Sequence, residues 1–122
     1  MLVEPIKTYR YLVTQPDLNA HGTLHGGILM KWVDESCGMQ ARLITGRVCA
    51  TRNINLIDFV STARLGDIVE VTVVHKETGK TSITFTATVR NAMGGVIAFF
   101  DKLTFVAVDK DHKPVSIDED TV

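Results

Sequence analysis

One stretch of the chain, NAHGTLHGGILMKWVDE (residues 19–35), holds most of the residues that could do chemistry. Gly26 and Gly27 open an apolar helical pattern, and free backbone amides at a helix start can bind an anion or an oxyanion. Asp34 lies at the edge between the polar and apolar sides of that helix, where small neighbours leave room for a ligand. The alternatives are a plain glycine turn and a solvated aspartate, and these residues alone leave both open.

Helix geometry decides whether these two features can serve one reaction. From Gly27 to Asp34 an α-helix advances roughly 10 Å, at about 1.5 Å per residue. An oxyanion donor and a general base must each lie about 3 Å from the reacting group or its water. Within a single chain, the glycine amides and Asp34 are therefore too far apart to act on one carbonyl carbon. In a pair of antiparallel helices, the start of each helix can lie next to Asp34 of the other helix. If both features are catalytic, the active unit is at least a dimer.

Asn19 and His25 are further candidates beside the glycine turn. Asn19 could hold a water or orient a carbonyl, although asparagine in a loop commonly serves turn formation. His25 could take part in proton transfer or could simply bond to the backbone of the turn. The two cysteines, Cys37 and Cys49, are not in a metal-ligand spacing, so we expect reduced thiols and no metal site.

Length and charge limit the function classes. The chain has 122 residues, with 13 basic and 14 acidic ones, so we expect a single domain over residues 1–122 and no nucleic-acid partner. The start, MLVEPIKTYRYLV, lacks the long apolar run of a signal peptide or an anchor. We therefore expect a cytoplasmic protein with no membrane insertion, and a polar, frayed tail from about residue 110.

The surrounding pattern predicts the elements that position these residues. A helical period covers 26–44, with Lys31, Glu35 and Arg42 facing water and apolar residues over most of the remaining circumference. Strands are expected at 8–13, 48–59, 68–76, 81–91 and 96–109, with hairpin-type turns at 65–67, 77–80 and 92–95. The expected fold is α+β: a five-stranded antiparallel sheet wrapped around one long central helix.

The spaced set Asn19, His25-Gly26-Gly27, Met30 and Asp34 resembles the signature of hotdog-fold acyl-CoA thioesterases of the cytosolic acyl-CoA hydrolase, YciA-like type. The resemblance continues through NINLIDFVSTARLGDIVEV, TGKTSITFTATV and FDKLTFVAVD, and covers roughly residues 8–109. One departure is Thr62, where the family often has a proline.

The resemblance implies a hotdog fold, a homodimer as the minimal active unit and commonly a hexamer. It also implies hydrolysis of acyl-CoA, with Asp34 as general base or nucleophile and Asn19 of the other protomer holding water or substrate. The amides of Gly26 and Gly27 would form the oxyanion hole next to His25. Coenzyme A is then part of the substrate, and no cofactor is expected.

The coenzyme A contacts are expected from cations in turns. Arg64 and Lys80 lie in turns beside expected strands, and the turn Gly79, Lys80, Thr81, Ser82 is similar to the family's turn. Trp32, Met39 and Phe59 are candidates for the acyl pocket. Two other functions stay open: a hotdog hydroxyacyl-thioester dehydratase using His25 with Asp34, and a non-catalytic acyl-CoA-binding module.

Overall fold

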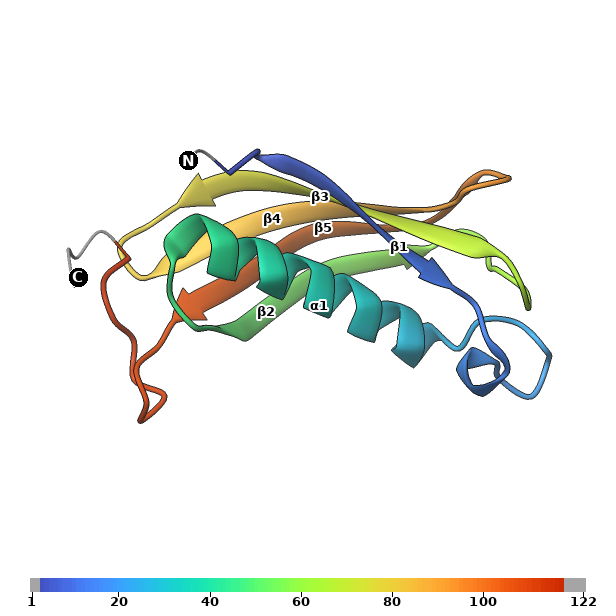
Figure 1. Ribbon diagram of the computed structural model, residues 1–122, viewed down its shortest axis with the longest axis horizontal. Helices are drawn as coiled ribbons and strands as arrows, with labels where there is room; N and C mark the ends of the chain where they lie inside the picture. Colours follow the sequence, from blue (N-terminus) through green and yellow to red (C-terminus); the bar gives the residue numbers. More distant parts are fainter. Residues whose placement is uncertain (1–2, 118–122) are drawn as a thin grey trace.

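One long helix and five strands form the regular structure of residues 3–117, the part of the chain that the computed structural model describes. They follow one another as β1 (Ile6–Leu12), a 3-10 turn (Gln15–Asp17), α1 (Gly26–Thr45), β2 (Cys49–Phe59), β3 (Ile68–Thr78), β4 (Ser82–Asn91) and β5 (Val96–Ala107). The strands make one antiparallel sheet that curves around α1 (Figure 1). The predicted hotdog-type α+β architecture is confirmed.

Capping groups set both ends of α1. At its start, Nδ1 of His25 accepts a hydrogen bond of 2.8 Å from the Gly27 N–H. This bond satisfies one of the first-turn amides that have no partner inside a helix. At its end, Gly46 adopts a φ of 70° and donates its N–H to the Arg42 carbonyl. Glycine enters this left-handed region without a steric cost, so the helix stops here.

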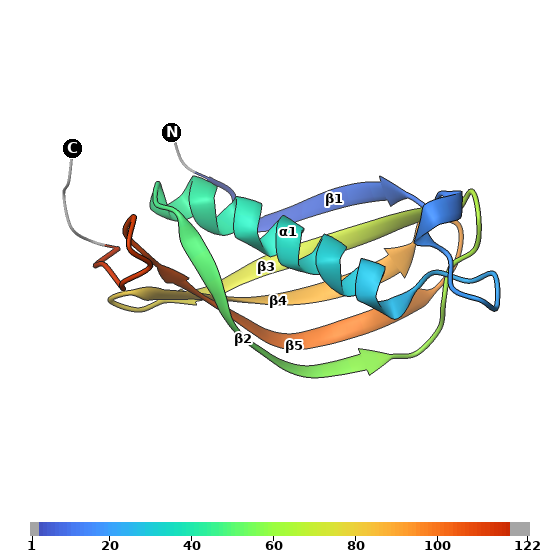
Figure 2. The ribbon, with the colours of Figure 1, turned by 90° about the horizontal axis from the view of Figure 1, so that it is seen from below.

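The sheet has the strand order β1-β3-β4-β5-β2, and every neighbouring pair is antiparallel. The two strands that flank α1 in the sequence, β1 and β2, therefore lie at opposite edges of the sheet (Figure 2). As a result α1 has one flank beside β1 and the other beside the first half of β2.

Hairpins join β3 to β4 and β4 to β5, as the turns at 77–80 and 92–95 predicted. The turn at 65–67 is different, because β2 and β3 are separated by β4 and β5. The expectation of a hairpin there is wrong. Gly66, with a φ of 87°, donates its N–H to the Val13 carbonyl and so ties this connection to the end of β1. A glycine-containing turn in the sequence predicts that the chain changes direction, but it does not predict which strands pair.

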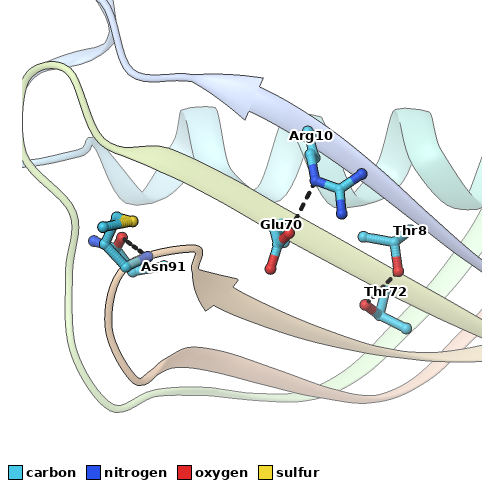
Figure 3. A network of polar contacts seen from close by, with 6 residues as sticks. Thr8, Arg10, Glu70, Thr72 and Asn91 are labelled. Atoms are coloured by element: carbon cyan, nitrogen blue, oxygen red, sulfur yellow. Dashed lines mark hydrogen bonds and ion pairs between the residues drawn. The ribbon is translucent and has the colours of Figure 1, made fainter.

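The core lies between the concave face of the sheet and one face of α1. Alternate residues of β3 and β4 point inward, and Val71, Val73 and Phe85 are fully buried. Most polar residues between them lie on the outer side, as the period of two predicts, although Thr84 is only 6% exposed. Figure 3 shows this outer side, where Arg10 pairs with Glu70 at 2.9 Å and the Thr8 and Thr72 hydroxyls lie 2.9 Å apart.

Two further expectations need correction. The apolar residues over most of the helix circumference predict burial on nearly all sides. Instead, α1 is buried on one face only, because a single sheet covers it from one side, and Met39 and Leu43 are 44% and 59% exposed. Residues 110–117 were expected to fray, yet Val115 donates to the Ala107 carbonyl and Ile117 to that of Lys80. Residues 118–122, the rest of that tail, lie outside the described residues. Within residues 3–117, no helix is long and apolar enough to cross a membrane.

Candidate functional site

Asp34 projects from α1 towards β2 and meets Thr51. The Thr51 hydroxyl donates a hydrogen bond of 2.5 Å to Oδ1 of Asp34. The contact forms because the chain turns back after Gly46, so that β2 begins beside the end of α1 and runs back along it. A hydroxyl bonded to a carboxylate makes a short, charge-assisted hydrogen bond that fixes the orientation of the carboxylate.

The other oxygen of Asp34 is available to a ligand. Its Oδ2 accepts no hydrogen bond from any residue between 3 and 117, and the side chain is half-buried rather than enclosed. A carboxylate that is oriented through one oxygen and open at the other can take a proton from a bound water or attack an electrophile.

The glycine turn at the helix start offers one free amide. The Gly27 N–H is taken by the His25 ring, whereas the Gly26 N–H has no partner within the described chain. A Cβ added to Gly27 would lie 2.9 Å from Cε1 of His25, so a side chain there would displace the ring that accepts the Gly27 N–H. The Phe59 ring lies beside Gly26, 3.9 Å from where a Cβ would be.

Asn19 organises the loop before the helix. Its Oδ1 accepts the N–H groups of His21 and Thr23 at 2.9 and 3.1 Å, and its Nδ2 donates to the Thr23 hydroxyl at 3.0 Å. These contacts form the turn. A primary amide has two N–H protons, and the second proton of Asn19 has no acceptor in the part of the chain described.

The remaining predicted site residues fall at two opposite ends of the molecule. Arg64 lies at the end where the helix begins, because Thr23 and Arg64 form a β-bridge. The turn 79–82 lies at the end where the helix stops, since Thr81 accepts from Ala107 and Val48 accepts from Val108. A helix of 20 residues is about 30 Å long, so one chain keeps Arg64 and Lys80 far apart. Figure 1 shows the segments that carry them, 60–67 and 79–82, at opposite ends of the sheet.

The turn 79–82 also has a defined shape. The Gly79 N–H donates to the Ser82 carbonyl at 2.7 Å, and a Cβ on Gly79 would lie 2.9 Å from the Ser82 hydroxyl. Lys80, at the tip, is exposed.

His25 and Asp34 do not meet within one chain. They are nine residues apart along α1, which is roughly 13 Å of helix, and the Nδ1 atom of His25 is already bonded to Gly27. The histidine–aspartate pair that a dehydratase would need is therefore not formed inside a protomer.

The cysteines are free thiols, and among residues 3–117 no cluster of three metal-ligating side chains exists. Burial raises the pKa of the Cys37 thiol well above its usual range, and the nearby Asp34 carboxylate adds to the rise. Cys37 therefore stays protonated in the core.

Sequence reasoning missed Thr51. The strand pattern gave a weak indication only, since it predicts that Cys49 and Thr51, two residues apart, share one face of the strand. That this face contacts Asp34 becomes visible only in the structure, where β2 runs back along α1. With Thr51 added, the site has a carboxylate and its hydroxyl partner in mid-helix, and a free amide with an asparagine at the helix start.

Comparison with known proteins defines the class. The family model described as "Thioesterase superfamily" matches residues 21–98, more than half of the chain. The chain belongs to the thioesterase superfamily, and the predicted resemblance to hotdog-fold acyl-CoA thioesterases is confirmed.

One curated relative and two solved structures illustrate this similarity. A Deinococcus radiodurans protein, provisionally named an esterase, is 32% identical over 89 residues, which are 72% of this chain and 59% of that protein. The chain thus spans 59% of the length of this curated relative. The hexameric thioesterase y2039 from Yersinia pestis matches with a TM-score of 0.83 and 29% identity, covering 91% of this chain and 93% of that one. An acyl-CoA hydrolase from Staphylococcus aureus, solved with butyryl coenzyme A and coenzyme A, matches with a TM-score of 0.78 and 28% identity, covering 93% and 69%.

Mutants of the Staphylococcus aureus hydrolase have also been solved, each with one asparagine, aspartate or threonine replaced by alanine; they are 25–26% identical to this chain. In that protein the aspartate follows the asparagine by 15 positions, and the threonine follows the aspartate by 17. Asn19, Asp34 and Thr51 have the same two spacings.

Proposed function

We propose that this protein hydrolyses acyl-CoA to a free carboxylic acid and coenzyme A, at a site shared by two antiparallel protomers. The observation that carries the proposal is the hydrogen bond between Thr51 and Asp34. Together with Asn19, these residues have the spacing of the three positions mutated in the Staphylococcus aureus acyl-CoA hydrolase. The acyl-CoA ligands of that protein indicate the substrate class.

In the proposed reaction, Asp34 acts on one face of the thioester carbonyl. Either its free oxygen takes a proton from a water that attacks the carbonyl carbon, or that oxygen attacks the carbon itself and forms an anhydride that water then hydrolyses. Thr51 keeps the carboxylate oriented in both cases. When the carbon–sulfur bond breaks, the thiolate takes up the proton that the water has released, giving the acid and the thiol.

The partner protomer supplies the stabilisation of the oxyanion. Because the helix start lies roughly 10 Å from the Asp34 of its own chain, the partner's Gly26 amide and the second Nδ2 proton of the partner's Asn19 hold the developing negative charge. Gly27 contributes only where the His25 ring turns away from its amide. The arrangement supports the dimer as the minimal unit, and the hexameric relative supports a trimer of dimers.

The same antiparallel pairing brings the two ends of the molecule together for coenzyme A. Arg64, at the helix-start end of one protomer, then lies near the partner's turn 79–82. Arg64 and Lys80 are both exposed cations, and they neutralise the phosphates of one coenzyme A from two chains, while Gly79, Thr81 and Ser82 shape the turn around it.

Replacing Asp34 with Asn tests the chemistry directly. We expect kcat for thiol release from acyl-CoA to fall by about 10³-fold, the loss typical for a positioned acid–base group, with folding and oligomer size retained because Asp34 is half-buried at the helix flank. Asp101→Asn, an exposed carboxylate on β5, is the matched control. Wild-type turnover in the Asp34 variant contradicts the proposal.

Mixing two inactive variants tests the shared site. In a dimer of one Asp34→Asn and one Asn19→Ala protomer, one of the two sites combines an intact Asp34 with an intact Asn19. After denaturation and co-refolding, we expect about a quarter of the wild-type activity from random pairing in a two-fold dimer. If the mixture stays as inactive as its parents, both residues act within one chain.

Two further assays separate the other functions. Hydration of an enoyl thioester without thiol release indicates the dehydratase, and acyl-CoA binding without turnover at any chain length indicates the binding module. Light scattering after size exclusion gives the number of protomers.

A further inference from the structure

A shallow apolar groove follows the second half of α1 on its solvent side. Its lining includes Gly38, Met39 and Leu43 of α1, Val48 and Cys49 on the β2 side, and Tyr9 and Tyr11 of β1 on the other side. Met39, Leu43 and Val48, which all line it, are exposed by 44%, 59% and 60%, and adjoining exposed apolar side chains often mark a binding site.

The groove begins at Gly38, one helical turn beyond Asp34, and neither Asp34 nor Thr51 lines it. Gly38 follows Asp34 by four residues, and side chains four apart on a helix are neighbours at about 5–6 Å. Cys49 precedes Thr51 by two residues and so shares its face of β2. Because β2 runs back along α1, Cys49 lies closer to the helix end, where its thiol is 3.5 Å from the Thr45 hydroxyl. Gly38 and Cys49 both line the groove.

Gly38 has no explanation in the fold itself. It lies inside α1 with an ordinary helical backbone, where glycine is less stable than alanine. A Cβ added there would meet only Cε2 of Phe105, at 3.7 Å, an ordinary contact. Neither backbone strain nor core packing requires glycine. Gly38 itself lines the groove, so a larger side chain at this position has the groove as its open direction.

We infer that this groove receives the acyl chain of the substrate, and that Gly38 sets the width of its entrance and thereby the chain lengths that are hydrolysed. The inference rests on the proposed thioester hydrolysis. With the thioester at Asp34, the chain passes Gly38 and ends against Leu43, a path of roughly 13 Å along the helix. The apolar lining and the adaptable Met39 side chain suit a linear hydrocarbon. Trp32, expected in the acyl pocket, is buried elsewhere, and Phe59 lies at the helix start.

Side chains of increasing size at Gly38 test the inference. In the wild type we expect kcat/KM to rise by about fourfold for each methylene that enters the groove, and then to level off. Gly38→Leu should lower the ratio of decanoyl-CoA to butyryl-CoA kcat/KM by at least about tenfold, the equivalent of losing two buried methylenes. Gly38→Ala should lower it less, while its melting temperature rises, so that a loss of activity cannot come from unfolding.

Gly95→Ala is the matched control. Gly95 lies in the β4–β5 turn, and a Cβ added there meets nothing within 4 Å. This variant should keep the wild-type chain-length profile. An equal loss at every chain length in Gly38→Leu overturns the inference. So does a changed oligomer size with an unchanged decanoyl-to-butyryl ratio in Gly38→Ala, because the glycine then serves a helix contact with a second copy.

Calorimetric titration separates this inference from the proposed function. Decanoyl-CoA, butyryl-CoA and coenzyme A are titrated into Asp34→Asn and into the same variant carrying Gly38→Leu. Tighter binding of decanoyl-CoA in the first protein, lost in the second, supports the groove. Equal affinities for the three ligands overturn it. If the wild type hydrolyses neither thioester, the proposed function fails. The same titration of the wild-type protein then tests acyl binding in the groove independently of hydrolysis.

Discussion

The two flanks of α1, one beside β1 and one beside β2, differ in whether their polar side chains have hydrogen-bond partners. On the β1 flank, Tyr11 stacks on Trp32 with ring centroids 4.8 Å apart, and its hydroxyl lies 2.9 Å from that of Ser36. Tyr9 donates to the buried Gln40 at 3.0 Å. Within residues 3–117, every buried side-chain polar atom has a partner.

On the β2 flank, the Asp34 carboxylate accepts a single hydrogen bond from the residues between 3 and 117. The groove begins one helical turn further along α1 and is lined on this side by Val48 and Cys49, while its β1 side is formed by Tyr9 and Tyr11. A helix flank in which all polar atoms are paired and the rings are packed contributes stability, since an unpaired buried group is costly. A flank that leaves a carboxylate oxygen unpaired beside an apolar groove is suited to a ligand. We therefore expect changes on the β1 flank to act on folding and changes on the β2 flank to act on turnover.

The largest effect is expected from Trp32→Ala. Trp32 is only 7% exposed and stacks on Tyr11, so its removal should lower the free energy of unfolding by about 3–5 kcal/mol. Urea denaturation measures the loss, and Lys31→Ala, an exposed neighbour, should stay within about 0.5 kcal/mol of the wild type. If the free energy of unfolding of the Trp32 variant falls by less than about 1 kcal/mol, the Tyr11–Trp32 stack does not stabilise this flank.

On the opposite flank, Thr51→Val removes the hydrogen bond to Asp34 and keeps the shape of the side chain. A hydrogen bond to a charged group is worth about 1.5–3 kcal/mol, so kcat should fall by roughly tenfold to a hundredfold. Steady-state thiol release measures this change. Thr51→Ser keeps the hydroxyl and should recover most of the rate, and an unchanged kcat in Thr51→Val excludes a role for the contact.

Tyr9→Phe is a smaller change on the β1 flank. It leaves Oε1 of Gln40, a residue 2% exposed, without its donor, and should lower the free energy of unfolding by about 1–2 kcal/mol. Its effect on kcat should be far smaller than that of Thr51→Val. The comparison fails if this variant is as slow as Thr51→Val while unfolding at the wild-type urea concentration.

The smallest effect is a dependence of stability on alkaline pH. Burial raises the pKa of both Tyr9 and Tyr11 above the ordinary value of 10.0. The folded state therefore holds these protons more tightly than the unfolded state. Their contribution to stability is complete below a pH of about 10 and declines as the pH rises further. Urea denaturation between pH 8 and 11 should show this decline in the wild type, and a weaker decline in the double variant Tyr9→Phe, Tyr11→Phe. Parallel curves for the two proteins contradict the assignment.

The sequence predicted the elements well because their signals are local. Alternation over 68–76 and 81–91 requires only the period of a strand with one buried face, and the structure places β3 and β4 there. The helix at 26–44 differs from α1 by one residue. Asn19, Gly26 and Asp34 could be proposed together because they lie in one continuous stretch, and a helix converts their spacing into distance.

The remainder depended on which segments meet, and local signals do not carry that information. Strand order, the course of residues 60–67 and the docking of residues 110–117 follow from how one sheet covers one helix. The pairing of Thr51 with Asp34, the capture of the Gly27 amide by His25 and the exposure of Met39 are of the same kind. The sequence by itself determined the elements and the candidate residues of residues 19–35, because hydrophobic period and turn chemistry act between near neighbours. Only the tertiary structure decided the partner of Asp34 and the open flank of α1, because these arise from contacts between residues distant in the chain.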